Sequence, residues 1–150
     1  MSTFCRTKSS VGFILLLVPS GNSTVIEVFS KITPLLFWRK ELRANSAGAG
    51  RTRGGFGQEI EVESRIGKSF ELLAAYDRIN HPARGRNGGS PGAPGSVSLK
   101  SGEVLKGKGF LTIPAHDRLV IHTPGGGGFG NPAERSCDDI NRDRGDGLVS

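Results

Sequence analysis

Alternating apolar and polar residues along the chain predict a series of β-strands. The clearest is 59–66, where Ile60, Val62 and Ile66 share one face and charged residues occupy the other. A register shift of one residue would turn those charges towards the core, so the register of this strand should be firm. Residues 24–32 and 35–42 carry a similar extended pattern and predict two more strands.

The next part of the chain, up to residue 122, also favours extended structure. Residues 70–76 fit either a strand or a helix, because the run is apolar without a clear period. Residues 97–105 have the pattern of a hairpin, and 110–113 and 119–122 have that of strands.

The tail carries the helix signals of this chain. Asn131 can cap a helix, Pro132 suits its first position, and Glu134 completes a capping box. Gly145 can end the helix. Three residues would share one face of it: Ala133, Cys137 and Ile140.

Glycine dominates the composition and argues against a helical bundle. The 150 residues include 23 Gly and 8 Pro, and a glycine inside a helix costs roughly 1 kcal/mol relative to alanine. These residues gather in three loops, at 45–57, 81–95 and 123–130. The sequence therefore predicts a mainly β, glycine-loop-rich domain with one short C-terminal helix.

Residues 1–21 differ from the rest of the chain. Arg6 and Lys8 precede an apolar run at 11–18 that Pro19 ends, which is the order of a secretory signal. A buried strand, or unrelated sequence at the start of a truncated chain, explains the segment too, and truncation is the interpretation we favour. No apolar run reaches the roughly 18 residues that a membrane span needs, so we expect no membrane segment.

One glycine motif matches a dinucleotide-binding pattern by its letters. Gly125, Gly127 and Gly130 follow an apolar strand and precede the expected helix. The fold behind that pattern needs another strand after the helix, and too few residues follow Gly147 to supply one. We therefore interpret the motif as a turn in which two backbones pass closely.

Two further motifs fail on their structural context. The segment Gly67-Lys68-Ser69 resembles the end of a phosphate-binding loop, but Val62 stands where that loop needs glycine. Ser90 lies in a serine-elbow pattern, but the prolines at 91 and 94 prevent the helix that should follow.

Metal ligands and catalytic residues are not indicated by any spacing in the sequence. The three histidines, His81, His116 and His122, fall on different segments, and no carboxylate pair is spaced to join them. We assign no catalytic residue and no metal site to this chain.

Two arginines and an aromatic residue in the first glycine loop suggest a binding role. Arg51, Arg53 and Phe56 stand among glycines, as in segments that bind single-stranded RNA through phosphate contacts and stacking. Such segments normally recur, and this one occurs once. A small basic RNA-binding or interaction module, with a formal charge of +6, is thus an alternative function, although we do not expect a nucleic-acid partner.

The three glycine loops together resemble one known family. They are similar, in the same order, to three blocks of hydantoinase B and 5-oxoprolinase. The matching parts are residues 49–58, the His81-Pro82-Ala83 segment with the glycines and prolines up to 95, and residues 123–135. The resemblance covers residues 22–150, and residues 1–21 match nothing in it. Acetone carboxylase has a related large subunit.

The resemblance implies an ATP-dependent hydrolase of small cyclic amides, such as 5-oxoproline or N-methylhydantoin. ATP would phosphorylate the amide oxygen and make the ring carbonyl easier for water to attack. A hydantoinase A-type subunit or domain would handle the ATP, a divalent metal would serve the intact enzyme, and the location would be cytoplasmic.

For this chain, the resemblance implies the C-terminal domain of a larger α+β subunit. Family members are several times longer, and the metal-binding half should lie upstream of the matching part. We therefore expect residues 22–150 to be inactive alone and to hold no cofactor or metal. Contacts to substrate or partner would come from Arg51, Arg53 and the glycines Gly125, Gly126, Gly127 and Gly128. Asn131 and His116 depart from the family pattern, which has aspartate and glycine there.

Overall fold

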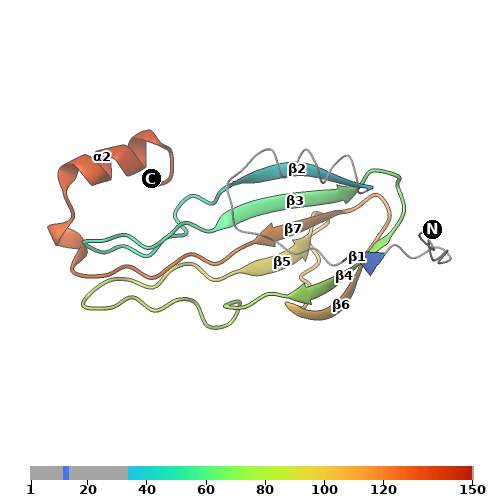
Figure 1. The fold of residues 1–150 in the computed structure, drawn as a ribbon, viewed down its shortest axis with the longest axis horizontal. Coiled ribbons are helices and arrows are strands. Elements are labelled where there is room, and N and C mark those ends of the chain that lie inside the picture. The colour runs from blue at the N-terminus through green and yellow to red at the C-terminus, as the bar shows by residue number, and fades with distance from the viewer. Residues whose placement is uncertain (1–11, 14–33, 150) are drawn as a thin grey trace, which may run out of the picture.

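The fold consists of two β-sheets that face each other, with a long extension at one end. A computed structural model describes residues 12–13 and 34–149 (Figure 1). The larger sheet has the order β2-β3-β7-β5, all antiparallel, formed by Leu35–Leu42, Gln58–Ser64, Arg118–His122 and Ser96–Leu99. The smaller sheet has the order β1-β4-β6, formed by Gly12–Phe13, Phe70–Ala75 and Lys108–Ile113. The expected mainly β fold is confirmed.

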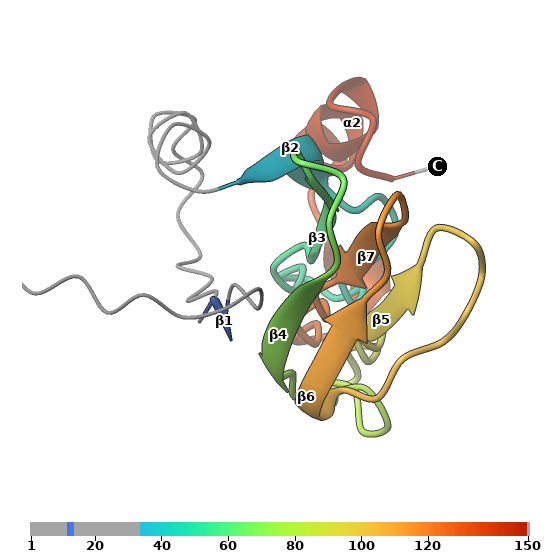
Figure 2. The ribbon, with the colours of Figure 1, turned by 90° about the vertical axis from the view of Figure 1, so that its right-hand side faces the viewer.

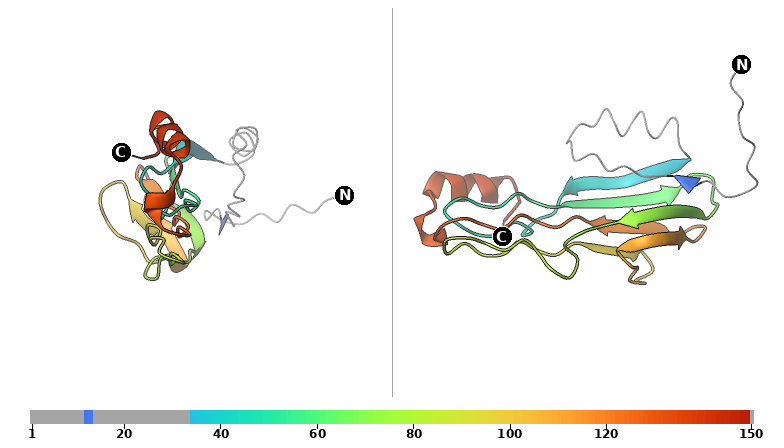
Figure 3. Two further views of the ribbon diagram at one scale, coloured as in Figure 1. Left: turned by 90° about the vertical axis from the view of Figure 1, so that its left-hand side faces the viewer. Right: turned by 60° about the horizontal axis from the view of Figure 1, so that its bottom comes forward.

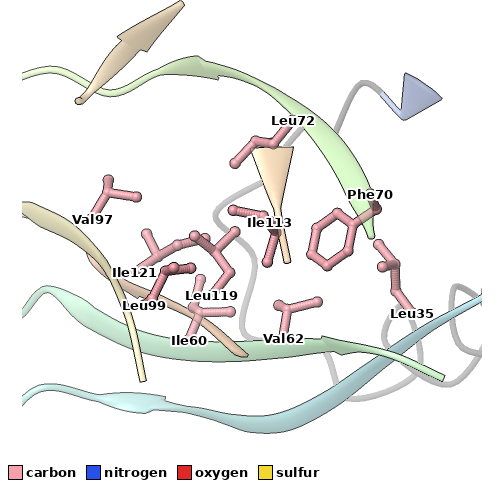
Figure 4. Close-up of a cluster of buried hydrophobic side chains, with 10 residues drawn as sticks. All are labelled: Leu35, Ile60, Val62, Phe70, Leu72, Val97, Leu99, Ile113, Leu119 and Ile121. Atoms are coloured by element: carbon pink, nitrogen blue, oxygen red, sulfur yellow. The ribbon is translucent and has the colours of Figure 1, made fainter. Parts of the chain in front are cut away.

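The apolar core lies between the two sheets (Figures 2 and 4). Partners in register, such as Ile60 with Ile121 and Val62 with Leu119, place pairs of side chains on the same inner face. Ten buried side chains make up this cluster: Leu35, Ile60, Val62, Phe70, Leu72, Val97, Leu99, Ile113, Leu119 and Ile121. We call the two sheets and this core the β-sandwich.

The alternation in β3 is confirmed, but its last apolar residue was placed wrongly. Ile60 and Val62 are fully buried, as predicted. Ile66 is 55% exposed, because the strand ends at Ser64 and a turn follows in which the Gly67 N–H donates to the Ser64 carbonyl. The period therefore stops before Ile66.

The charged face of β3 is also less open to solvent than the alternation suggests. Glu61 is 4% exposed, because Arg118 of β7 donates to its Oε1 at 2.9 Å and Lys100 Nζ lies 3.5 Å from its Oε2. The Arg118 hydrogen bond holds the pKa of Glu61 below its ordinary value, although burial acts in the opposite direction. A buried but paired carboxylate thus replaces the expected exposed one.

The run at 70–76 is a strand rather than a helix. In β4, Phe70, Leu72 and Ala74 are buried and the residues between them are exposed. The predicted hairpin at 97–105 is short, because β5 meets its second arm only in a bridge between Ser98 and Val104. The predicted strand at 24–32 and most of segment 1–21 lie outside the described residues.

The predicted continuous tail helix is wrong in one respect: it is interrupted. A short 3₁₀ helix, Pro132–Glu134, is followed by the α-helix α2, Cys137–Gly145. Asn131 caps the first by accepting from the Ala133 N–H, but Ser136, which has extended backbone angles, caps the second. The Glu134 carboxylate points towards Arg51, 4.0 Å away, rather than completing a capping box.

The face predicted for the tail helix is not formed, because the break falls inside it. Ala133 and Cys137 are exposed and Ile140 is half-buried. Within residues 12–13 and 34–149, no helix has the length and apolar character to cross a membrane.

The three glycine loops leave the same end of the β-sandwich and run side by side towards α2 (Figures 1 and 3). They extend beyond the ends of β2, β3, β7 and β5, at the end of the molecule that also holds α2. We call residues 45–57, 81–95 and 123–130 together the glycine extension. It contains most of the residues that the sequence proposed as functional.

Candidate functional site

The glycine extension is held together by backbone hydrogen bonds between its three segments. The Gly48 N–H donates to the Gly126 carbonyl at 2.8 Å, and the Gly126 N–H donates to the Gly55 carbonyl at 2.8 Å. The middle segment joins in the same way, since the Arg86 N–H donates to the Gly128 carbonyl at 2.9 Å. All three segments therefore form one unit.

Backbone contact this close requires glycine. A Cβ at Gly125 would overlap the Ser46 carbonyl oxygen, and one at Gly127 would overlap the Arg84 carbonyl oxygen. A Cβ at Gly128 would overlap the Ala49 carbonyl oxygen. The interpretation of 125–130 as a place where backbones pass closely is supported by this packing.

Arg53 points into an ion cluster that anchors the tail. Its Nε donates to Asp143 Oδ2 at 2.8 Å, and Arg135 Nη2 donates to the same oxygen at 2.9 Å. The three side chains are only 12–14% exposed. Burial raises the pKa of Asp143, but the hydrogen bonds and charges of Arg53 and Arg135 outweigh it and leave that pKa below its ordinary value. Arg53 thus ties the extension to α2.

Arg51 lies on the surface of the same unit and remains accessible. Its side chain is 57% exposed, and its Nη1 lies 4.0 Å from Glu134 Oε2. The neighbouring Thr52 pairs with Phe129 through two backbone hydrogen bonds of 2.9 Å, which fix the position of Arg51. Arg51 and Arg53 therefore do not converge on one open site.

A hollow that the sequence did not predict lies on the flank of the glycine extension. It has a volume of about 540 Å³ and is lined by Arg78, Ala83, Arg84, Arg86, Pro124 and Gly125 to Gly127. Arg84 and Arg86 belong to the middle segment and Arg78 precedes it. These three arginines thus lie next to three of the four glycines that were predicted as contact residues. The signal in the sequence was the closely spaced arginines at 78, 84 and 86, which belong to no recognised motif.

A second hollow, of about 600 Å³, adjoins the first at Arg78. Its lining includes Tyr76, His81 and Lys108. Burial raises the pKa of Tyr76 to about 12. Lys108 pairs with Asp77 at 2.9 Å, and Arg78 and Lys106 leave the lining with a net positive charge.

The histidines lie on separate parts of the described structure. His122 of β7 sits opposite Ser96 of β5, with Ser96 Oγ 3.0 Å from His122 Nδ1 and Glu59 Oε2 3.7 Å from His122 Nε2. These three are neighbours in the sheet register, on its outer face. His116, with φ of 65°, occupies a turn position that favours glycine.

A divalent metal does not fit the side chains that the structure describes. In residues 12–13 and 34–149, no three His, Cys, Asp or Glu side chains gather closely enough to hold a metal ion. The pair Asp138 and Asp139 lies at the start of α2, where Asp139 faces Arg142.

Comparison with known proteins now gives this arrangement a family. A family model described as hydantoinase B/oxoprolinase matches residues 12–132, which start ten residues before the boundary expected at 22. The chain belongs to the hydantoinase B/oxoprolinase family. The predicted resemblance is confirmed, and the matched region contains all three segments of the glycine extension.

Relatives of this family are much longer than the chain. 5-Oxoprolinase 1 of Arabidopsis thaliana is 39% identical over 109 residues, which cover 70% of this chain and 8% of the plant protein. An uncharacterized protein of Methanocaldococcus jannaschii is 37% identical over 131 residues, 85% of this chain and 23% of its own length. The chain therefore spans less than a quarter of these curated relatives.

Solved structures show the same fold. The ATP-dependent caprolactamase of Pseudomonas jessenii superposes with a TM-score of 0.67 at 28% identity, covering 83% of this chain and 23% of that one. Nucleotide-free acetone carboxylase superposes with a TM-score of 0.61 at 18% identity, covering 83% and 21%. The fold of most of this chain thus recurs within longer chains.

Proposed function

We propose that this chain supplies the C-terminal β portion of a hydantoinase B/5-oxoprolinase-type subunit. In the intact enzyme, that subunit would hydrolyse a cyclic amide such as 5-oxoproline or N-methylhydantoin with ATP. Support comes from the 39% identity to 5-oxoprolinase 1 and the fold shared with an ATP-dependent caprolactamase. The observation that carries the proposal is the glycine extension, whose three segments match the family in order and pack as one unit.

The chemistry needs more than the described residues provide. Hydrolysis of an amide requires an activated water and stabilisation of the oxyanion. ATP would prepare the amide by phosphorylating its oxygen, and we derive no step through a metal because the described side chains do not fit one. We propose that the chain is inactive alone and positions a substrate or a partner through Arg51 and the glycines Gly125 to Gly128, while Arg53 holds the tail.

Partner and location follow from the same proposal. We propose a hydantoinase A-type subunit or domain as the partner that handles ATP, and the cytoplasm as the location. Arg51 is the exposed arginine of the 51–57 segment and is suited to such a contact.

The RNA-binding alternative gains no support from the structure. It needs Arg51 and Arg53 to face the same strand of nucleic acid, but the Arg53 side chain is 14% exposed and bound to Asp143. Salt-dependent binding of single-stranded RNA that is lost on Arg51→Ala would revive it.

A chimaera tests the proposed function. Residues 34–149 would replace the matching segment of a full-length 5-oxoprolinase, and ATP-dependent release of glutamate from 5-oxoproline would be measured. We expect the chimaera to retain turnover, and the same chimaera carrying Gly127→Ala to lose it because the extension cannot pack. A correctly folded but inactive parent chimaera would contradict the proposal.

The isolated chain provides the second arm of this test. We expect purified 1–150 to release no glutamate, with or without an A-type partner. Turnover above that of an Arg53→Ala variant would show that the active site lies within this chain.

A further inference from the structure

The hollow on the flank of the glycine extension carries positive charge that no described residue balances. Arg78, Arg84 and Arg86 are exposed side chains that line it, and none forms an ion pair or a side-chain hydrogen bond within residues 12–13 and 34–149. By contrast, Arg39, Arg53 and Arg118 each pair with a carboxylate at 3.0 Å or less.

Acidic residues of the neighbouring segments pair with other cations. Asp77, which precedes Arg78 in the chain, pairs with Lys108 at 2.9 Å. Glu134 faces Arg51, and Asp143 binds Arg53. No carboxylate is among the residues that line the hollow, so its three guanidinium groups repel one another and favour an anion between them.

The backbone around these arginines is held in place before any ligand arrives. Both backbone groups of Arg86 are bound, since its N–H donates to Gly128 and its carbonyl accepts from Gly130 at 3.0 Å. The Arg78 carbonyl accepts from the Gly95 N–H at 3.1 Å, with Arg78 itself at φ of 58°. A non-glycine residue in this conformation is uncommon and is often found where function fixes the backbone.

One glycine of the hollow has a free donor. Gly125, Gly126 and Gly128 donate their N–H groups to Ala93, Gly55 and Ser90 at 2.8–3.0 Å. The Gly127 N–H donates to no acceptor in the described part of the chain. A backbone N–H beside arginines is a typical contact for an oxyanion.

We propose that this hollow is a binding site for a small ligand that carries two or more phosphate groups. Guanidinium groups bind phosphate oxygens in pairs of hydrogen bonds, and three of them suit an anion with several oxygens better than a single carboxylate. A volume of about 540 Å³ also leaves room for an organic substituent. The inference goes beyond the proposed function, because it concerns binding by this chain and does not depend on the family's reaction.

Calorimetric titration of the full chain tests the site, with inorganic pyrophosphate as the probe at low salt. We expect the double variant Arg84→Gln/Arg86→Gln to bind at least tenfold more weakly. The matched control is Lys68→Gln/Arg144→Gln, which also removes two positive charges, from exposed side chains outside the hollow, and it should change affinity less than twofold. Thermal unfolding of each variant checks that the fold is unchanged.

Four outcomes would overturn the proposal. One is the absence of pyrophosphate binding, and another is an equal loss in the Lys68→Gln/Arg144→Gln control, which would indicate attraction by net charge alone. The third is acetate binding as tightly as pyrophosphate at equal ionic strength, and the fourth is single-stranded RNA binding more tightly through the same arginines. Arg84→Lys/Arg86→Lys keeps the charge but removes the paired guanidinium donors, so affinity that stays well below that of the unmodified chain would support paired hydrogen bonding. Because the assay measures binding, its failure leaves the proposed hydrolysis untouched.

Discussion

The β-sandwich and the glycine extension solve the problem of close packing in opposite ways. In the β-sandwich, branched side chains such as Ile60 and Ile121 fill the space between two sheets and are fully buried. In the glycine extension, glycines stand where the segments meet, and a backbone carbonyl of the facing segment occupies the space that a Cβ would take, as the Ser46 carbonyl does at Gly125. The first region depends on apolar burial, and the second on backbone hydrogen bonds and exact shape.

The two regions should therefore respond differently to substitution. A sandwich tolerates a modest change of side-chain volume, because neighbouring side chains adjust. The glycine extension has few side chains that can move away, so an added methyl group meets backbone. The following predictions test this difference, beginning with the largest effect.

Among the variants proposed below, Gly127→Ala should have the largest effect. Its Cβ would overlap the Arg84 carbonyl oxygen, and we expect a loss of about 3 kcal/mol or more, above the usual range for overpacking of a side-chain core. Urea denaturation measures the free energy of unfolding. The matched control is Gly55→Ala, where no atom lies within 4 Å of the new Cβ and the change should stay within about 0.5 kcal/mol. Equal effects at the two sites would refute the backbone-packing account.

Leu119→Ala tests the β-sandwich. Leu119 is 1% exposed, so removing its side chain leaves a cavity and should lower the free energy of unfolding by about 3 kcal/mol. Val104→Ala, at a side chain that is 81% exposed, should change it by less than about 0.5 kcal/mol. If both variants unfolded at the same urea concentration, the assignment of the core would be wrong.

Asp143→Asn tests the joint between the extension and α2. The substitution leaves Arg53 and Arg135 without their shared carboxylate, and we expect a loss of about 2 kcal/mol, less than for a fully buried pair. Hydrogen exchange should speed up in α2 and leave β3 unchanged. Arg142→Gln, which breaks an exposed pair on the same helix, should alter stability by less than about 0.5 kcal/mol.

The same aspartate should give the extension an acid sensitivity. The pKa of Asp143 in the folded protein lies below its ordinary value of 3.8. Its stabilising contribution is therefore complete above pH 3.8 and is lost as the pH falls through the lower folded value. Asp143→Asn should flatten the acid limb of the stability profile, and an unchanged limb would assign acid unfolding to other carboxylates, such as Glu61.

The smallest effect on stability should come from Phe110→Ser, which tests the surface of the β-sandwich. Phe110 is 81% exposed and pairs across β4 and β6 with Leu73, which is 44% exposed. This apolar pair should promote self-association of the isolated chain. Sedimentation should show a shift towards monomer in Phe110→Ser and no shift in Lys108→Ser on the same strand.

Much of the β-sandwich was predictable because its signals are local. Alternation alone placed Ile60 and Val62 inside, and the strand at 119–122 was found with nearly its observed bounds. Local signals failed at Ile66, where the strand ends early, and at Ser136, where a serine cap competes with the predicted start at Pro132. In both places one local hydrogen bond decides the outcome. The Gly67 N–H donates to the Ser64 carbonyl in the turn that ends the strand, and the Asp139 N–H donates to Ser136 Oγ in the cap that begins α2.

The strand pattern, the three glycine loops and, through the order of these loops, the family of this protein can be read from the amino-acid sequence. Which arginines are available depends on the folded structure, because the partners of an arginine lie far away from it in the chain. Arg53 meets Asp143 ninety positions later, whereas Arg78, Arg84 and Arg86 meet the glycines at 125–127 with no carboxylate between them. The sequence gives the charge and the spacing of these arginines, but the fold decides which side chains come close enough to pair.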